Sequence, residues 1–96
     1  MADGVNIALD ARPRLSAKAR LRADARSGET LLLYPERGLK LNRTGEAVLA
    51  LCTGTTTVAE IAGALAAQHG AEPETVLGEV RAFLDGLAAR GLLEGV

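Results

Sequence analysis

The side chains that most often perform catalysis are scarce in this sequence. His69 is the only histidine, and Cys52 is the only cysteine. Acid–base and nucleophilic catalysis both need an activating partner close to the reacting group. His69 stands at the predicted end of a helix, where a cationic imidazole suits the helix dipole. Cys52 lies among apolar residues, which predicts a buried thiol, so neither position indicates catalysis.

The other polar residues form no pattern typical of an enzyme site. Ser16 and Ser27, the two serines, fall in a predicted tail and a predicted turn. Glu72 and Glu74 suit the first turn of a helix better than a carboxylate pair for acid–base work. There is no Gly-rich phosphate loop and no metal-ligand spacing. We therefore predict a binding protein with no enzymatic activity, metal or cofactor.

The composition indicates one domain. The chain has 96 residues, of which 48% are hydrophobic, and Tyr34 and Phe83 are the only aromatic residues. Its core must therefore consist of Leu, Val, Ile and Ala. A single cysteine excludes an internal disulfide and a zinc cluster. Neither a signal-peptide pattern nor a membrane-spanning run occurs, which predicts a cytoplasmic protein.

Charge is distributed unevenly along the chain. Residues 1–46 contain 9 Lys/Arg and 6 Asp/Glu, a balance of +3, whereas residues 47–96 contain 2 and 6, a balance of −4. A basic half beside an acidic half suits a charged partner, such as an acidic peptide or enzyme surface. The alternative is ordinary solvated surface charge.

Residues 1–11 are predicted to form a flexible tail, and residues 12–96 a single domain. The strands and helices that could position a binding surface all lie in this domain. Residues 18–26 alternate between charged and apolar positions, which predicts a half-buried strand. Its inward side chains would be Ala19, Leu21, Ala23 and Ala25. A turn with Gly28 leads into 30–34, whose apolar run predicts a central strand buried on both faces. After a turn over 35–38, residues 39–41 form the third, edge strand.

Three helices are predicted to follow. Asn42 is a favoured N-cap for a helix over 43–53. Thr57 and Glu60 form a capping box for a second helix that ends at Gly70. Pro73 opens a third helix, Gly91 ends it, and 92–93 add an extended segment. The order predicts an α+β fold, a three-stranded antiparallel sheet followed by a three-helix bundle, resembling a winged helix-turn-helix.

Two kinds of ligand suit this architecture. A DNA-binding winged helix needs Lys and Arg along its last helix. Residues 72–90 instead contain four acidic and two basic side chains. An exposed edge strand, by contrast, offers unpaired backbone groups to which an extended peptide can add. We therefore favour a peptide ligand over a DNA-binding regulator.

The third helix would form the second wall of this peptide groove. Its apolar arc has Val76, Val80 and Leu87 at its centre and Phe83 on one flank. Leu77, Leu84 and Ala88 lie on the other flank with Arg81 beside them, and they could face a ligand. The alternative is that all these residues belong to the core.

Several short motifs resemble the pyrroloquinoline quinone (PQQ) biosynthesis protein D (PqqD) family. They are Leu41-Asn42-Arg43-Thr44-Gly45, Leu51-Cys52-Thr53-Gly54, Thr57-Val58-Ala59-Glu60-Ile61, Phe83-Leu84 and Arg90-Gly91-Leu92-Leu93, with Arg12-Pro13 upstream. The resemblance covers residues 12–93.

The resemblance implies a peptide chaperone that acts as a precursor-peptide recognition element. Such proteins bind the precursor peptide PqqA and present it to PqqE, a radical S-adenosylmethionine enzyme. Related domains serve other peptide-modifying pathways, which is an alternative. The resemblance places the groove between the third strand and the third helix, without nucleic acid or membrane. The expected peptide-binding residues are Gly38, Leu39, Lys40, Leu41, Asn42, Val76, Leu77, Val80, Arg81, Leu84 and Ala88.

Overall fold

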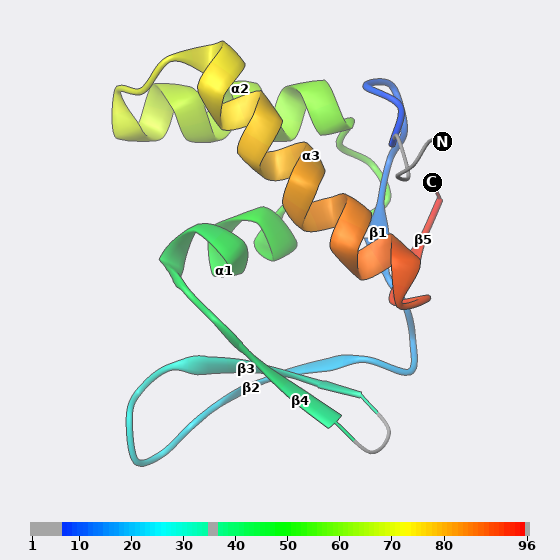
Figure 1. The fold of residues 1–96 in the computed structure, drawn as a ribbon, viewed down its shortest axis with the longest axis vertical. Helices are drawn as coiled ribbons and strands as arrows, with labels where there is room; N and C mark the ends of the chain where they lie inside the picture. Colours follow the sequence, from blue (N-terminus) through cyan, green and yellow to red (C-terminus); the bar gives the residue numbers. More distant parts are fainter. Residues whose placement is uncertain (1–6, 35–36, 96) are drawn as a thin grey trace.

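A three-stranded antiparallel sheet and three helices form two layers in the computed structural model, which describes residues 7–34 and 37–95 (Figure 1). The sheet has the order β2-β3-β4, so β3 is central and the other two strands form its edges. This order, and the predicted α+β fold with three helices, are confirmed. The strand bounds are Arg20–Ala23 for β2, Thr30–Tyr34 for β3 and Arg37–Leu41 for β4.

The strand register divides the sheet side chains between two faces. Leu32 of β3 lies opposite Leu21 of β2 and Leu39 of β4, so these three share one face. That face also carries Leu41, and it points toward the helices because Leu32 and Leu41 are buried. Leu31 and Leu33 point to the opposite face, where they are half-buried. The prediction that β3 is buried on both faces is therefore wrong for the second face.

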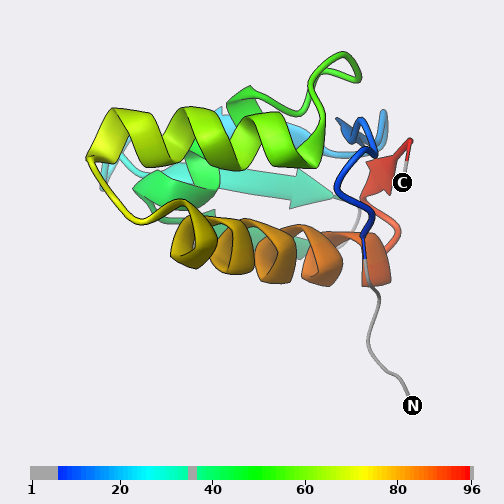
Figure 2. The ribbon, with the colours of Figure 1, turned by 90° about the horizontal axis from the view of Figure 1, so that it is seen from above.

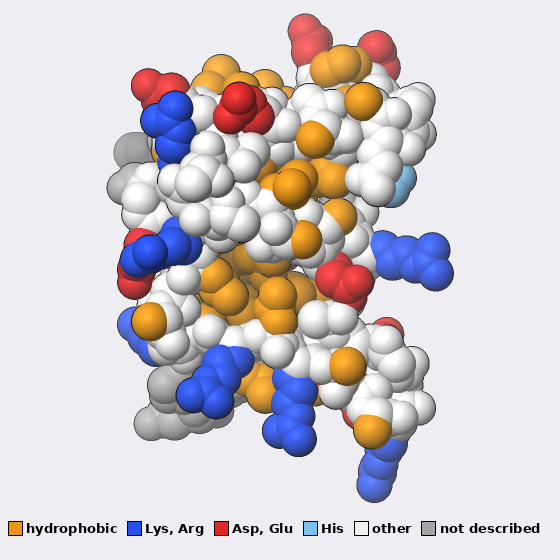
Figure 3. Space-filling view, turned by 180° about the vertical axis from the view of Figure 1, so that it is seen from behind, with side chains coloured by type: hydrophobic (Ala, Val, Ile, Leu, Met, Phe, Trp, Pro, Cys, Tyr) orange, Lys and Arg blue, Asp and Glu red, His pale blue; other side chains and the backbone are white. Residues whose placement is uncertain are grey.

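The prediction of a half-buried first strand is also wrong. All four residues of β2 are exposed, and Leu21 is 43% exposed although it lies on the helix-facing side. Only Ala19, just before β2, is buried among the expected inward residues. β2 packs mainly against β3, and no helix packs closely on it. Seen from behind, hydrophobic side chains are accordingly visible in a hollow between the two layers (Figure 3).

The helices begin where the capping residues predict. α1 (Arg43–Ala50) has Asn42 as its N-cap, and the side chain of Asn42 accepts a hydrogen bond from the Gly45 amide at 2.7 Å. α2 (Val58–His69) begins with the predicted capping box of Thr57 and Glu60 and ends at Gly70, whose φ is 62°. α3 (Pro73–Ala89) begins at Pro73 as predicted. Figure 2 shows α2 and α3 side by side above the sheet.

α1 is shorter than the predicted helix over 43–53. After Ala50, the amides of Leu51 and Cys52 donate to carbonyl groups three residues back, at 3.1 Å each. These bonds tighten the last turn and end the helix before Thr53.

The two ends of the described chain form a second, two-stranded sheet. β1 (Arg14–Leu15) pairs antiparallel with β5 (Leu93–Glu94). An extended segment near residue 93 is expected from the sequence, but its pairing with β1 is not.

The segment before β1 is packed against the helices. Ile7 is buried, and the carbonyl groups of Leu9 and Ala11 accept hydrogen bonds from the first amides of α2. Of the expected flexible tail over 1–11, residues 1–6 lie outside the described residues. Residues 7–11 cover the open amides at the start of α2, which would otherwise lack partners within the helix.

Candidate functional site

The outer side of β4 is a free sheet edge. β4 pairs with β3 on one side only, and within residues 7–34 and 37–95 no strand pairs with the other side. Leu39 and Leu41 point toward the helices, whereas Lys40 points toward the open face, where Gly38 leaves a gap in the row of side chains. An edge of this kind presents backbone donors and acceptors to an incoming extended chain.

A hollow lies where β4 ends and α1 begins. It has a volume of about 270 Å³ and is lined by Asn42, Thr44, Gly45 and Val48, together with Glu79 and Phe83 from α3. Gly45 is essential to its shape, because a Cβ at this position would lie 3.1 Å from the Phe83 ring. The hollow thus combines an aromatic side chain, a carboxylate and the end of an edge strand.

Several expected peptide-binding residues belong to the core. Leu41, Val76, Val80 and Leu84 are all buried, and Leu84 is 0% exposed. For Val76, Val80 and Leu84 of the third helix, the core alternative describes the structure, and Leu41 of the third strand is buried as well. Gly38, Lys40 and Asn42 are exposed, whereas Leu39, Leu77, Arg81 and Ala88 are half-buried.

The flank of α3 that carries Leu77 and Arg81 faces other parts of the chain. Leu77 lines an apolar hollow between α2 and α3, of about 160 Å³. The Arg81 guanidinium donates to the Ile7 carbonyl at 3.1 Å, and the Ile7 amide donates to Asp85 at 3.0 Å. These contacts anchor the N-terminal segment, so Leu77 and Arg81 do not line the hollow beside β4.

The opposite flank of α3 lies at that hollow instead. Glu79 and Phe83 are spaced four residues apart, so they share one helix face. Both are absent from the expected binding residues. A carboxylate and an aromatic ring on the same helix face, as with Glu79 and Phe83, are a sequence signal for a binding surface. Sequence periodicity alone, however, does not say which flank of α3 faces β4.

Reactive side chains are not brought together in the described residues. Cys52 is buried, its thiol donates to the Val48 carbonyl at 3.3 Å, and burial raises its pKa to about 11. This matches the expected buried thiol and leaves almost no thiolate at neutral pH. His69 is an exposed last residue of α2. Across residues 7–34 and 37–95, no group of three His, Cys, Asp or Glu side chains could hold a metal ion.

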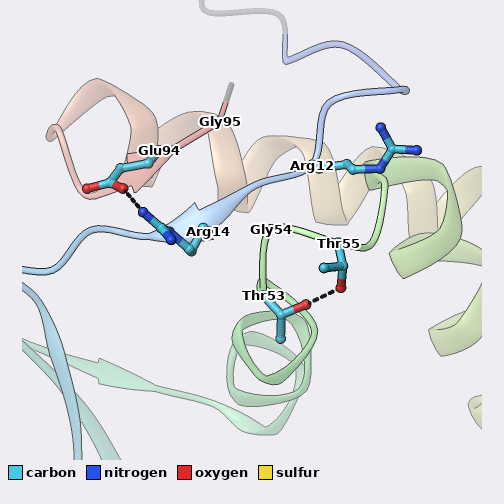
Figure 4. Close-up of a pocket in the computed structure, with 7 residues that line it drawn as sticks. All are labelled: Arg12, Arg14, Thr53, Gly54, Thr55, Glu94 and Gly95. Atoms are coloured by element: carbon cyan, nitrogen blue, oxygen red, sulfur yellow. Dashed lines mark hydrogen bonds and ion pairs between the residues drawn. The ribbon is translucent and has the colours of Figure 1, made fainter.

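A larger hollow of about 470 Å³ lies between the β1–β5 sheet and the loop before α2 (Figure 4). Its polar side chains do not converge on a common point. Arg14 points to Glu94, with 2.6 Å between Nη2 and Oε1, and Thr53 bonds to Thr55 at 2.8 Å. Arg12 points away from both pairs. Because four of its polar side chains form two pairs and Arg12 points away from them, this hollow is a weaker candidate site than the edge of β4.

No described helix is both long and apolar enough to cross a membrane.

Comparisons with known proteins point to one family. The family profile of Coenzyme PQQ synthesis protein D (PqqD) matches residues 29–93. A Bradyrhizobium diazoefficiens protein named PqqA binding protein is 34% identical over 89 residues, which cover 93% of this chain and 86% of that protein. Bifunctional coenzyme PQQ synthesis protein C/D of Methylorubrum extorquens is 38% identical over 82 residues. These residues cover 85% of this chain but 22% of the relative, so the chain spans about a fifth of that protein.

Two solved structures share the fold. The PqqD truncation of Methylobacterium extorquens PqqCD, a stand-alone recognition element for ribosomally synthesized and post-translationally modified peptides (RiPPs), aligns with a TM-score of 0.74 and 38% identity. The alignment covers 85% of this chain and 87% of that one. TbiB1, solved in complex with the TbiA(beta) leader peptide, aligns with a TM-score of 0.73 and 26% identity over 86% of this chain and 96% of that one. The profile match alone extends over more than half of the sequence, and the chain belongs to the PqqD family.

Proposed function

We propose that this protein is a non-catalytic peptide chaperone in PQQ biosynthesis, which binds the precursor peptide PqqA and presents it to the enzyme PqqE. The unpaired edge of β4 is the observation that carries this proposal. It is supported by a relative named PqqA binding protein and by a structural relative in complex with a leader peptide. A cytoplasmic location and independence from cofactors are part of the proposal.

The peptide adds to β4 as a fourth strand. Backbone hydrogen bonds to residues 38–42 supply much of the affinity, and side-chain contacts fix the register. A peptide side chain enters the hollow beside Asn42, where Phe83 offers apolar surface and Glu79 a carboxylate. The half-buried Leu39 provides further apolar surface next to the edge.

A second candidate ligand is the leader peptide of another modified peptide. The similarity to TbiB1 favours it, because that protein has the same fold and was solved with a leader peptide. Both candidates use the same groove and differ only in the peptide sequence. A panel of PqqA and unrelated leader peptides distinguishes them by affinity.

We also propose that the fold is a winged helix-turn-helix variant that does not bind DNA. α3 would be the recognition helix of such a domain, and its stretch over 72–90 has a net charge of −2. Phosphate contacts require the opposite sign.

Strand addition can be tested with peptides that are methylated at single backbone nitrogens. In an added strand, alternate amides of the peptide point to β4. Methylation of these amides should weaken binding about tenfold, since each removes a hydrogen bond and adds bulk at the edge. Methylation of the intervening amides should change affinity much less. Calorimetry with synthetic PqqA provides the dissociation constants.

The same titration, followed by amide chemical shifts of labelled protein, locates the site. Shifts at residues 38–42 and around Glu79 and Phe83 support the groove described above. Shifts centred on Leu77 and Arg81 would move the site to the other flank of α3. If PqqA has no effect and duplex DNA shifts α3, the peptide-chaperone proposal fails.

A further inference from the structure

The face of the sheet that points away from the helices has no cover within the described part of the chain. All three helices lie on the other side of the sheet (Figure 1). Leu31 and Leu33 stand at the centre of this open face, on β3. Because they are only half-buried, they leave an apolar strip exposed to solvent.

Cations border the two leucines on the outer strands. Leu33 is paired with Arg20 of β2, and Leu31 lies between Arg22 of β2 and Lys40 of β4. Since paired residues in adjacent strands point to the same face, these three cations surround the apolar strip. Lys and Arg side chains project from the sheet layer in Figure 3.

The arginines on this face are not engaged by the described side chains. Lys40 lies 3.6 Å from Glu29, in an exposed ion pair. Among residues 7–34 and 37–95, neither Arg20 nor Arg22 forms a side-chain hydrogen bond or ion pair. Arg22, Leu31 and Leu33 also line a concave region of about 460 Å³ next to the turn after β2. Guanidinium groups without a partner among the described side chains, placed around an apolar centre, suit a carboxylate-rich protein surface.

The open face is continuous with the edge of β4. A fourth strand added at this edge would place every second side chain on the open face, beside Gly38 and Lys40. A partner bound to the open face would therefore also contact the bound peptide. This link makes a protein that acts on the peptide a better match for the face than an unrelated acidic protein.

We propose that Arg20, Arg22, Lys40, Leu31 and Leu33 form a docking surface for an acidic protein partner that engages the peptide held on β4. The link to the peptide rests on the proposed function, whereas the acidic partner is inferred from the charge of the face. A second copy of this chain is a poorer occupant through β2, because antiparallel pairing of two β2 edges would bring arginines together.

Charge reversal on the open face tests this proposal, with PqqE as the probe. Arg22→Glu should weaken binding of PqqE about tenfold at low salt, because it replaces an attractive contact with a repulsive one. Arg12→Glu is the matched control, since it makes the same charge change at an exposed residue in the hollow of Figure 4, on another part of the molecule. It should change binding less than twofold. Added salt should weaken binding of the unaltered protein.

Separate measurements keep this proposal distinct from the peptide-binding one. PqqA affinity is measured for each variant without PqqE, and PqqE affinity with and without PqqA. Arg22→Glu should leave PqqA affinity unchanged. If the unaltered protein does not bind PqqA, the proposed function is overturned. The comparison of PqqE binding to the unaltered protein and to Arg22→Glu, made without PqqA, still tests the open face.

Three results would overturn the docking surface. The first is an equal effect of Arg22→Glu and Arg12→Glu, which would indicate non-specific attraction. The second is self-association in sedimentation that Arg22→Glu abolishes, which would make a second copy the occupant. The third is tighter binding of duplex DNA than of PqqE.

If Arg22→Glu is poorly folded by circular dichroism, Arg20→Gln combined with Arg22→Gln removes the charges more conservatively, and it should weaken PqqE binding by a smaller factor.

Discussion

The two edge strands of the sheet, β2 and β4, each have one side without a paired strand in the described residues, but their surroundings differ. β4 continues directly into α1, and its end lies beside the hollow that Gly45 and Phe83 shape. β2 is followed by a turn, packs on no helix closely, and exposes all four of its residues. Of the two edges, only that of β4 has neighbouring elements among the described residues that supply walls and a fixed end.

Charge alone does not separate the edges. β2 carries Arg20 and Arg22, and β4 carries Arg37 and Lys40, of which Lys40 lies 3.6 Å from Glu29. Charged side chains on an edge strand discourage pairing with other strands. The neighbouring elements beside β4, rather than its charge, therefore distinguish it from β2 as a peptide site.

The largest expected difference between the edges is in stability. Leu41→Ala on β4 should lower the free energy of unfolding by about 2–4 kcal/mol, because it leaves a cavity under a nearly buried side chain. Leu21→Ala on β2 should lower it by less than about 1 kcal/mol, because Leu21 is 43% exposed. Urea denaturation measures both, and equal losses would show that the edges are packed alike.

A second difference concerns peptide affinity. Gly45→Ala should weaken PqqA binding by roughly threefold to tenfold, because the new Cβ would force the Phe83 ring to shift within the hollow. Gly63→Ala is the control, since a Cβ on this exposed α2 glycine meets no atom within 4 Å. It should stabilise the helix by about 0.5–1 kcal/mol and leave affinity unchanged. Calorimetry measures the PqqA affinity of both variants. If Gly45→Ala binds PqqA as tightly as the unaltered protein, the hollow is not part of the peptide site.

A third difference concerns how the residues that cap the two strands respond to low pH. At the β2–β3 turn, hydrogen bonds from the Arg26 amide and the Ser27 hydroxyl lower the pKa of Asp24 below its ordinary value of 3.8. The stabilisation is therefore complete above pH 3.8 and is lost as pH falls through the lowered pKa. At the end of β4 the corresponding cap is Asn42, which does not titrate in this range.

Amide chemical shifts recorded between pH 5 and pH 2 test this contrast. The Arg26 amide should move with the titration of Asp24, whereas the Gly45 amide should not follow that titration. Asp24→Asn should abolish the movement at Arg26 and leave PqqA affinity unchanged. A parallel response of the Arg26 and Gly45 amides would contradict the assigned roles of Asp24 and Asn42.

The smallest expected effect is that of the ion pair on β4. Glu29→Gln removes the 3.6 Å contact with Lys40, and it should change the free energy of unfolding by less than about 0.5 kcal/mol because both side chains are exposed. Denaturation at low and high salt measures it. A larger, salt-sensitive loss would mean that this pair helps to fix the β4 edge.

Elements set by nearby residues were predictable from the sequence. Asn42, Thr57 with Glu60, and Gly70 act within one helical turn, so their helix ends follow from local chemistry. Contacts between distant residues were not predictable in the same way. The exposure of β2 depends on where the helices pack, and the β1–β5 pairing joins opposite ends of the chain.

The candidate site shows the same division. The edge position of the third strand follows from the order of the elements, and that order was correct. The α3 wall was assigned to the flank with Leu77 and Arg81, but these residues contact α2 and the N-terminal segment. Both flanks of α3 have apolar residues at helical spacing, so only the tertiary contacts of Phe83 identify the flank beside Asn42.

The pairing of β1 with β5 has a consequence for the order of folding. It joins Arg14 to Glu94, 80 positions along the chain, through a ribbon of two residues per strand. Closing a flexible loop of that length costs roughly 4 kcal/mol of chain entropy, more than so short a ribbon returns. The ribbon should therefore form last, after the helices have brought its strands together, and open first. Faster hydrogen exchange at Ser16, whose amide bonds to Leu92, than at the amides of β3 would reveal this order.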